Sequence, residues 1–226
     1  DLEEKNRYGA RALHKAVIGN RPKVAQTLIA AGAQLDPKDI SGYSPLLRAV
    51  YLDKEDMARL LLKAGADPFV ENIYGECALH LAARQGYTWL CESMLEQKPE
   101  SLNAQDKHGW TALHRAVDKG REDTTRMLLA RGADVNLATR DQTVPLHKAC
   151  ATYPALARLL LTHGARVNLR DARGQGALYW AAGNKDAALV DALLEKGADA
   201  KATTVAGDQP LHRAAAYGQV AVIKRL

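Results

Sequence analysis

Apolar residues recur along the chain in short stripes of helical spacing, and polar, turn-forming segments separate these stripes. In residues 111–119 the apolar positions repeat at i, i+1, i+4 and i+5, which is the spacing of one face of a short helix. Gly120 follows this stripe and favours the end of the helix. The stripe consists of Ala112, Leu113, Ala116 and Val117.

A second helix is predicted over residues 122–130, EDTTRMLLA. Its acidic start suits the positive end of the helix dipole, and Met127, Leu128 and Leu129 supply the face that we expect to be buried. Gly132 closes this helix, and the segment ADVNLATRD after it is rich in turn formers. The pattern therefore predicts a unit of helix, turn, helix and extended finger.

This unit repeats along the whole chain. One register leucine marks each first helix, and successive register leucines lie 33, 33, 34, 33, 32 and 33 residues apart. So regular a period is the sequence signature of a repeat protein. The register leucines are Leu13, Leu46, Leu79, Leu113, Leu146, Leu178 and Leu211. The predicted repeats span residues 1–41, 42–74, 75–108, 109–141, 142–173, 174–206 and 207–226, the last of them partial.

The repeated phrases resemble a known family. TALHRA, VPLHKA and QPLHRA accompany the first helices, and LLKAGAD, LLARGADVN, LLTHGARVN and LLEKGAD accompany the ends of the second helices. These motifs are similar to those of the ankyrin repeat and cover nearly the whole chain. The resemblance implies a single domain over residues 1–226, an all-α repeat solenoid of stacked antiparallel helix pairs with β-hairpin fingers. It also implies a concave surface formed by the fingers and the first helices.

A histidine follows the register leucine in most repeats, and we call this position the histidine slot. A residue that recurs in repeat after repeat is a poor candidate for a single active site. Helices about 9 Å apart also keep successive histidines too distant to share one zinc ion with bonds of about 2 Å. The resemblance implies that each imidazole hydrogen-bonds neighbouring loops. The slot holds His14, His80, His114, His147 and His212, with Leu47 and Tyr179 in the two other repeats.

Some repeats depart locally from the pattern. Gln142 stands where other fingers have glycine, and the fifth repeat is one residue short near Thr152. The third repeat has EQKPESLN in place of a Gly-Ala pair, so we expect its second helix to end differently. The chain begins at a finger-like segment and stops inside a second helix, which leads us to expect a fragment of a longer protein.

Composition narrows the class of function. The net charge is +5 without a dense basic tract, which disfavours nucleic acid as a partner. Cys77, Cys91 and Cys150 are scattered and odd in number, so neither a disulfide framework nor a metal site is expected, and a cytosolic or nuclear location is favoured. No apolar run approaches about 18 residues, so membrane insertion is not expected.

No motif of a nucleophile elbow, a metalloprotease, a phosphate-binding loop or a dinucleotide-binding turn occurs in the sequence. We therefore expect no enzyme, no cofactor and no small-molecule substrate. The main prediction is a protein-interaction scaffold that binds a partner peptide or a folded domain on its concave surface. The alternative is a targeting or regulatory module of a larger enzyme, channel or ubiquitin-ligase adaptor.

Three sets of residues are candidates for sites. Residues beside the finger glycines and after the first helices are expected to face the partner, because aromatic and arginine side chains often anchor interfaces. These partner-binding candidates are Tyr43, Tyr51, Leu52, Ile73, Tyr74, Arg84, His108, Trp110, Asp118 and Lys119. The fifth repeat has five basic residues against one acidic residue, and Arg140, Lys148, Arg170 and Arg173 are candidates for a patch that attracts an acidic partner.

A third candidate is a modification site. Asn136 in LLARGADVN resembles the sites that an asparaginyl hydroxylase uses on ankyrin repeats, with Leu128 eight residues earlier and Asp134 and Val135 just before it. The alternative for Asn136 is a structural asparagine in a turn, which the composition of the segment favours.

Overall fold

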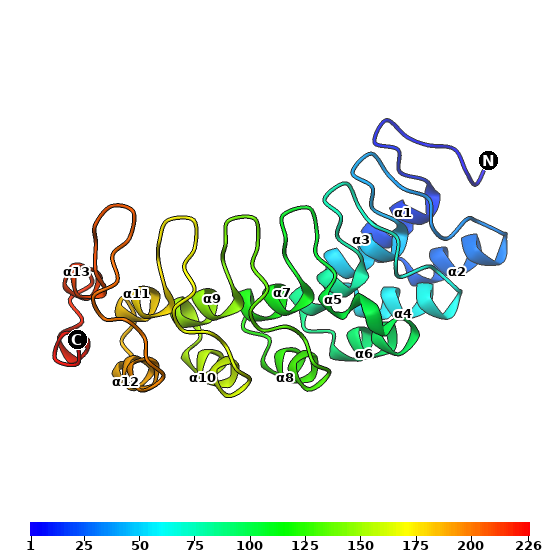
Figure 1. Ribbon diagram of the computed structural model, residues 1–226. Coiled ribbons are helices and arrows are strands. Elements are labelled where there is room, and N and C mark those ends of the chain that lie inside the picture. The colour runs from blue at the N-terminus through cyan, green and yellow to red at the C-terminus, as the bar shows by residue number, and fades with distance from the viewer. The chain divides into compact units, whose positions relative to one another are not determined.

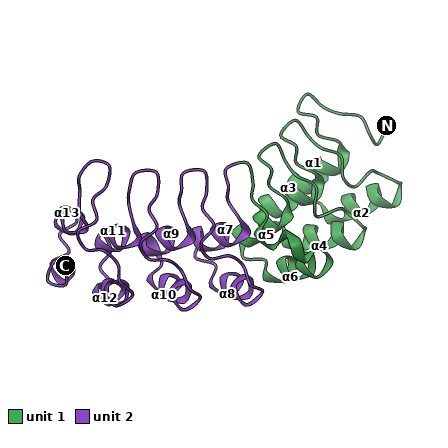
Figure 2. Cartoon of the chain, viewed as in Figure 1, with its two compact units in different colours: residues 1–107 green, residues 108–226 purple.

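A computed structural model describes residues 1–226, which divide into two compact units, residues 1–107 and 108–226 (Figure 2). Unit 1 contains helices α1 to α6 and a 3-10 helix, and unit 2 contains α7 to α14. The helices of unit 1 are α1 Ala12–Ile18, α2 Pro22–Ala30, α3 Pro45–Tyr51, α4 Glu55–Lys63, α5 Ala78–Gln85, α6 Thr88–Gln97 and η1 Pro99–Asn103. Those of unit 2 are α7 Ala112–Asp118, α8 Glu122–Ala130, α9 Pro145–Thr152, α10 Pro154–Thr162, α11 Ala177–Ala182, α12 Ala187–Glu195, α13 Pro210–Ala216 and α14 Val220–Ile223.

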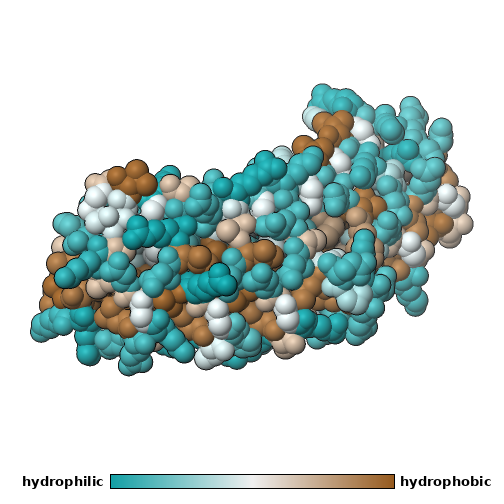
Figure 3. Space-filling model, in the orientation of Figure 1, coloured by the Kyte–Doolittle hydropathy of each residue, from teal (hydrophilic) through white to brown (hydrophobic).

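Within each unit the helices form two rows. The first helices of the repeats pack side by side in one row, the second helices form the other, and finger loops extend from the row of first helices (Figure 1). This arrangement confirms the predicted all-α repeat solenoid. Hydrophilic side chains cover most of the fingers of unit 2 on the face shown in Figure 3, and hydrophobic ones gather in patches along its helices.

The predicted helix pair is present at residues 111–130. Helix α8 spans the predicted residues, and α7 begins one residue later than predicted because Thr111 is its N-cap, whose hydroxyl accepts a hydrogen bond from the His114 amide. Gly132, with φ +86°, donates its N–H to the Leu129 carbonyl after α8. A left-handed residue costs little at glycine, so Gly132 ends the helix as expected.

The register leucines form the core of both units. Leu46 and Leu146 are fully buried, whereas Leu211 in the last repeat is 43% exposed. Alanines three residues after the register leucines, such as Ala116 and Ala149, are also fully buried. Small side chains at this position allow neighbouring first helices to pack closely, which explains why few aromatic residues are needed in the core.

The fingers differ in one respect from the expected β-hairpins. The only β-bridge joins Arg170 and Gly176, and no finger contains a regular strand. An aspartate, asparagine or threonine closes each finger instead. Asp39, for example, accepts hydrogen bonds from the amides of Ser41 and Tyr43 through one carboxylate oxygen. These side-chain turns add to a backbone hydrogen bond across the finger, which the Asp39 amide donates to the Tyr43 carbonyl at 3.0 Å.

Backbone hydrogen bonds stack successive fingers within each unit. The amide of Ile73 donates to the carbonyl of Ser41 at 3.2 Å, and the amide of Arg140 donates to the carbonyl of His108 at 2.9 Å. The acceptor directly precedes the finger glycine in these pairs. Gln142 takes the place of that glycine in the fifth repeat and adopts φ +57°, a left-handed conformation that glycine adopts more readily.

The irregular third repeat also behaves as predicted. Helix α6 ends at Gln97, and the 3-10 helix Pro99–Asn103 follows it without the left-handed glycine that closes α8. Proline at the start of this short helix donates no amide hydrogen, so it stops α6 and begins the next turn.

Candidate functional site

The histidine slot is a structural site. His114 is fully buried, its Nδ1 accepts the amide hydrogen of Thr111 at 3.2 Å, and its Nε2 lies 3.2 Å from the carbonyl oxygen of Thr143 in the next finger. Because Nδ1 is an acceptor, the imidazole is neutral and its Nε2–H donates to the carbonyl. The ring therefore caps its own helix and ties it to the following loop.

The same pair of hydrogen bonds recurs in other repeats. Nε2 of His14 bonds the Tyr43 carbonyl at 3.0 Å, that of His80 bonds Ala104 at 3.1 Å, and that of His147 bonds Leu169 at 2.8 Å. His212 is exposed, and only its Nδ1 has a hydrogen bond, from the Gln209 amide at 2.9 Å. The prediction that these histidines link neighbouring loops is confirmed for His14, His80, His114 and His147.

Burial lowers the pKa of two of these histidines, His14 in unit 1 and His147 in unit 2. Desolvation lowers the pKa of His147 below its ordinary value of 6.5, although the Leu169 hydrogen bond and Asp171 oppose the shift. The folded state therefore binds fewer protons than the unfolded state. Stability from this histidine is fully present above about pH 6.5 and is lost as the pH falls toward the folded pKa, at up to about 1.4 kcal/mol per pH unit.

We expect the urea concentration at the unfolding midpoint of unit 2 to decrease when the pH is lowered from 7.5 to 5.5. We expect this decrease to be smaller for His147→Gln. Glutamine retains hydrogen-bonding groups but does not titrate in this range. Unfolding curves of both proteins at several pH values measure the two slopes. Equal slopes in wild type and variant would contradict a neutral buried His147.

Cations and aromatic rings alternate along the inner surface of unit 2, where the first helices meet the fingers. The ring of Trp110 has the guanidinium of Arg115 at 4.6 Å and the ammonium of Lys148 at 5.3 Å from its centroid. The guanidinium of Arg213 lies 4.7 Å from the Trp180 centroid. We call Trp110, Arg115, Lys148, Trp180 and Arg213 the cation–aromatic row.

Two cavities adjoin this row. One of about 180 Å³ lies along the first helices, and the other, of about 330 Å³, lies between the helices and the fingers. Thr143, Lys148 and Trp180 line both of them. A folded chain with two hollows that share a cation and an indole ring can receive side chains of an extended segment.

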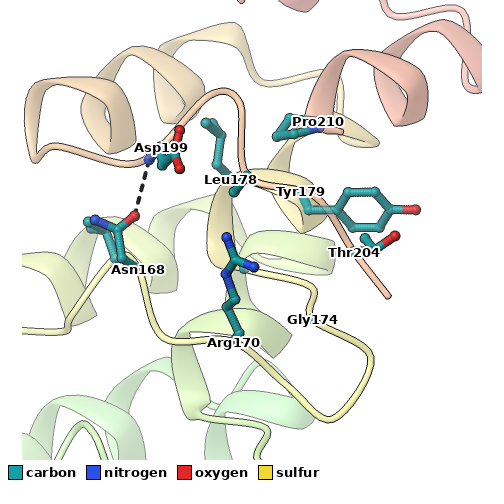
Figure 4. A pocket seen from close by; sticks show the side chains of 11 residues that line it. Asn168, Arg170, Gly174, Leu178, Tyr179, Asp199, Thr204 and Pro210 are labelled. Atoms are coloured by element: carbon teal, nitrogen blue, oxygen red, sulfur yellow. Dashed lines mark hydrogen bonds between the residues drawn. The ribbon is translucent and has the colours of Figure 1, made fainter. Parts of the chain in front are cut away.

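A third cavity of about 290 Å³ lies between the last two complete fingers of unit 2 (Figure 4). Tyr179 and Gly176 line it, in the positions that His114 and Thr111 occupy in the fourth repeat. In Figure 4 the Asn168 side chain bonds the Asp199 amide at the edge of this cavity, at 3.1 Å. The cavity is therefore associated with the loss of the slot histidine and of the N-cap side chain.

The predicted partner-binding residues of unit 1 lie in two places. Tyr51 is 39% exposed, and the guanidinium of Arg84 lies 5.5 Å from its ring centroid. Leu52, beside them, is half-buried. Ile73 and Tyr74 are exposed at the tip of a finger.

The expectation that Tyr43 faces a partner is wrong. Its side chain is only 5% exposed, with its ring edge-on to Tyr51 and beneath the guanidinium of Arg48. Burial also raises the pKa of its phenol. Tyr43 follows the finger glycine and is buried against Tyr51 and Arg48, so it contributes to packing.

The remaining predicted partner-binding residues belong to unit 2. His108 and Lys119 are exposed, and Trp110 and Asp118 are half-buried. Asp118 lies 3.0 Å from Lys119 and 3.8 Å from Lys148, so one carboxylate serves both ammonium groups. The ten candidates are thus divided between the two units, and in unit 2 Lys148 connects Trp110 with Asp118.

The four basic residues predicted as an acidic-partner patch also separate. Lys148 and Arg173 line the same 330 Å³ cavity. Arg170 lines the 290 Å³ cavity and donates to the Thr203 carbonyl at 3.2 Å, and Arg140 is exposed on a finger. Lys148 and Arg173 are therefore the two of the four that share a cavity, which Asp141 and Asp171 also line.

Asn136 connects two repeats. Its amide nitrogen donates to the Gly164 carbonyl at 3.2 Å, and its amide oxygen accepts from the Arg166 backbone N–H at 2.8 Å. These bonds give Asn136 a structural role in the turn. Hydroxylation of Asn136 stays a prediction.

The three cysteines differ in their surroundings. Burial raises the pKa of Cys77, but the hydrogen bond with His80 Nδ1, 3.3 Å from its Sγ, outweighs burial and leaves that pKa lowered. All three cysteines are free and buried, and burial raises the pKa of Cys91 to about 12 and raises that of Cys150 as well, so both thiols stay protonated near neutral pH. No group of three or more histidine, cysteine or acidic side chains is placed to hold a metal ion. The longest helix has 10 residues, and none has the length and hydrophobicity that crossing a bilayer requires.

The sequence prediction missed Arg115, Trp180 and Arg213, which belong to the cation–aromatic row. Each directly follows the histidine slot, a position that the motif leaves open between a fixed leucine and a fixed alanine. A comparison of that position between repeats would have found them. Its residues are Lys15, Arg48, Leu81, Arg115, Lys148, Trp180 and Arg213.

Comparisons with known proteins agree with this geometry. Residues 1–72, 64–139 and 146–226 match a family model described as ankyrin repeats. The chain is 31% identical over 212 residues to the B-cell lymphoma 3 protein homolog of Mus musculus, covering 90% of this chain and 47% of that protein. It is also 31% identical over 225 residues to inversin of Homo sapiens, covering 95% and 21%.

A solved structure is similar in fold. The crystal structure of the ankyrin repeat domain of Bcl-3, described as a unique member of the IkappaB protein family, superposes with a TM-score of 0.71 at 31% identity. The match covers 93% of this chain and 95% of that one. By contrast, the chain spans about half the length, 47%, of the mouse B-cell lymphoma 3 protein homolog.

Proposed function

Because the chain belongs to the ankyrin repeat family, we propose that it is a non-enzymatic protein-interaction module that binds an extended segment of a partner on the inner surface of unit 2. The observation that carries this proposal is the pair of cavities that share Lys148 and Trp180. An interface of standard size buries about 800 Å² on each partner, which several repeats together can supply. Trp110, Asp118 and Lys119 lie in the same unit and belong to the proposed contact surface.

Aromatic side chains explain why this surface suits binding. Trp180 and Trp110 are half-buried and held by neighbouring cations, so they are already ordered before a partner arrives. Binding then costs little side-chain entropy, and large rings contribute much of the contact area. We propose Tyr51 and Arg84, with Ile73 and Tyr74 on a finger, as a second contact surface on unit 1.

The prediction for this function is that Trp180→Ala loses most of the peptide binding of the wild-type chain. Truncating a central interface tryptophan costs about 2 kcal/mol or more, roughly a thirtyfold loss in affinity. A library of random twelve-residue peptides displayed on phage, selected on the wild-type chain, supplies the probes. Affinities of the selected peptides are then measured for both proteins.

A control variant tests whether the loss of binding is specific to the proposed contact surface. Tyr8→Ala removes a ring that is 52% exposed on unit 1 and outside both proposed contact surfaces. We expect it to bind the selected peptides as the wild type does. Equal affinity of Trp180→Ala and wild type would contradict the proposed surface, and failure of the wild type to select any peptide would contradict peptide capture itself.

We also keep a role within a longer protein as a second proposal. Its support is that the matched region is 47% of the B-cell lymphoma 3 protein homolog, 21% of human inversin and 17% of the human transient receptor potential cation channel subfamily A member 1. A catalytic, transport or adaptor segment elsewhere in the full-length protein would support this second proposal.

Two further assignments are proposals. We assign residues 1–226 to a single ankyrin domain with the repeat boundaries given above, because the helix pairs keep one period across both units. We also propose an intracellular location, cytoplasmic or nuclear, because three free and buried thiols suit a reducing compartment.

A further inference from the structure

The guanidinium of Arg213 lies among three aromatic rings of unit 2. Its central carbon lies 4.7 Å from the Trp180 ring centroid, 4.9 Å from that of Tyr179 and 5.1 Å from that of Tyr217. Gly183 makes this position possible, because a Cβ there would come within 2.7 Å of Arg213 Nε. Arg213 Nε is buried and has no hydrogen-bond partner, and the same is true of Arg48 Nε at the equivalent position of unit 1.

Another repeat shows how a cation at this position is normally neutralised. Arg48 occupies the same position of the motif and forms an ion pair with the carboxylate of Asp39, the residue that closes its finger. In the repeat of Arg213 the finger-closing residue is Thr204, whose hydroxyl accepts from the Asp208 amide at 3.1 Å. A hydroxyl stands where Arg48 has its counter-ion, so Arg213 lacks the carboxylate that its own repeat would supply.

The same replacement occurs at Lys148. Thr139 closes the finger of that repeat in place of aspartate. Lys148 is paired with Asp118, whose nearest oxygen is 3.8 Å away and which also pairs with Lys119. Asp141 and Asp171 line the 330 Å³ cavity together with Lys148. The two repeats that flank Trp180 thus combine a cation on the first helix with a threonine in the finger.

The arrangement of rings favours a carboxylate ligand. Guanidinium groups that stack on aromatic rings keep their N–H groups in the plane free, and this planar fork matches a carboxylate. Cations already lie near Trp110 and Trp180, at centroid distances of 4.6 to 5.3 Å. Rings occupied in this way are less available for the base stacking that single-stranded nucleic acid uses, so an acidic peptide fits better.

We infer that the partner segment carries two carboxylates, one that binds Arg213 and one that binds Lys148, on either side of Trp180. This inference rests on the proposed function and specifies the chemistry of the partner. First helices about 9 Å apart place the two cations about 18 Å apart, which an extended chain of about 3.3 Å per residue spans in five or six residues. The segment therefore has two acidic residues at about that spacing.

The decisive variant is Thr204→Asp. This variant places an aspartate at the position that Asp39 holds in the repeat of Arg48. The new carboxylate would form an ion pair with Arg213 and compete with a carboxylate of the partner. We expect binding of the selected peptides that contain an acidic pair to weaken by about tenfold or more, since charge-assisted hydrogen bonds are lost. Arg213→Gln should weaken the binding of the same peptides to a similar extent, without adding a competing carboxylate.

The probes are the peptides selected from the random library and a synthetic fluorescein-labelled peptide with two glutamates six residues apart in a glycine and serine background. Its glutamine counterpart and a single-stranded oligonucleotide serve as comparison ligands, and fluorescence polarisation measures all of them. Lys15→Gln is the matched control, because Lys15 is an exposed cation at the same motif position in unit 1. We expect it to bind as the wild type does.

The outcomes separate the two proposals. Enrichment of acidic pairs together with weaker binding by Thr204→Asp and Arg213→Gln supports the inference. Selected peptides that depend on Trp180 but lack acidic pairs, or that bind Thr204→Asp unchanged, overturn the inference and leave the proposed function standing. Tighter binding of the oligonucleotide than of the glutamate peptide also overturns it. Circular dichroism of each variant verifies that unit 2 remains folded.

Discussion

Replacing His114 with alanine destabilises unit 2 by about 3 kcal/mol. The substitution removes a fully buried ring and leaves the Thr111 amide and the Thr143 carbonyl without their imidazole partners. Unsatisfied buried groups cost about 1–3 kcal/mol, and the cavity left by the ring adds to that cost. Chemical unfolding followed by circular dichroism measures the loss.

His212→Ala is the matched control, because the same motif position is exposed there and only Nδ1 has a hydrogen bond. We expect this variant to lose less than about 1 kcal/mol. Peptide affinity of His114→Ala, measured under conditions where it remains folded, should equal that of the wild type. A variant that kept wild-type stability but lost peptide binding would show that His114 acts in recognition.

The local pattern of apolar and turn-forming residues was sufficient to predict where these helices begin and end. The stripe in residues 122–130 predicted α8 with its observed ends, and the irregular EQKPESLN segment predicted a different end for α6. The recurrence of histidine at one position of the motif argued against a single active site, and the resemblance to the ankyrin repeat implied the hydrogen-bonding role of His114. These features depend on contacts inside a repeat or with the next one, and periodicity encodes both.

Surface exposure was harder to predict. Tyr43 and Trp110 both directly follow a finger glycine, yet Tyr43 is buried and Trp110 is half-buried. The ring of Tyr43 is enclosed by Tyr51 and Arg48, which the motif does not specify. Position within a repeat therefore fixes the backbone, but the variable side chains of neighbouring positions decide which rings a partner can reach.

The candidate site depended on a comparison between repeats. Arg213 resembles an ordinary exposed cation in the sequence, and its significance appears only when Arg48 and Asp39 show the pair that another repeat forms. Thr204, considered without Arg213, is also an ordinary turn residue in the sequence. The relevant signal is the combination of a cation on the helix with a threonine in the finger, and these residues are nine positions apart.

A second large effect is expected at a finger glycine, where Gly42→Ala should destabilise unit 1 by about 3 kcal/mol or more. Gly42 adopts φ +75°, which costs an alanine about 1–2 kcal/mol. The added Cβ would lie 2.6 Å from the Ile73 amide nitrogen and 2.9 Å from the Asn72 carbonyl carbon. Both atoms belong to the backbone of the next finger, so relief requires that finger to move.

Movement of the finger would break the hydrogen bond from the Ile73 amide to the Ser41 carbonyl, now 3.2 Å long. Gly65→Ala in the same unit separates the conformational cost of a left-handed alanine from the cost of the steric clash. Gly65 has φ +97°, but no atom lies within 4 Å of its added Cβ. We expect Gly65→Ala to cost only the conformational penalty of about 1–2 kcal/mol. Urea unfolding of both variants measures the difference. Equal losses would mean that the fingers of unit 1 yield without cost, and that their close stacking contributes little to the stability of the repeats.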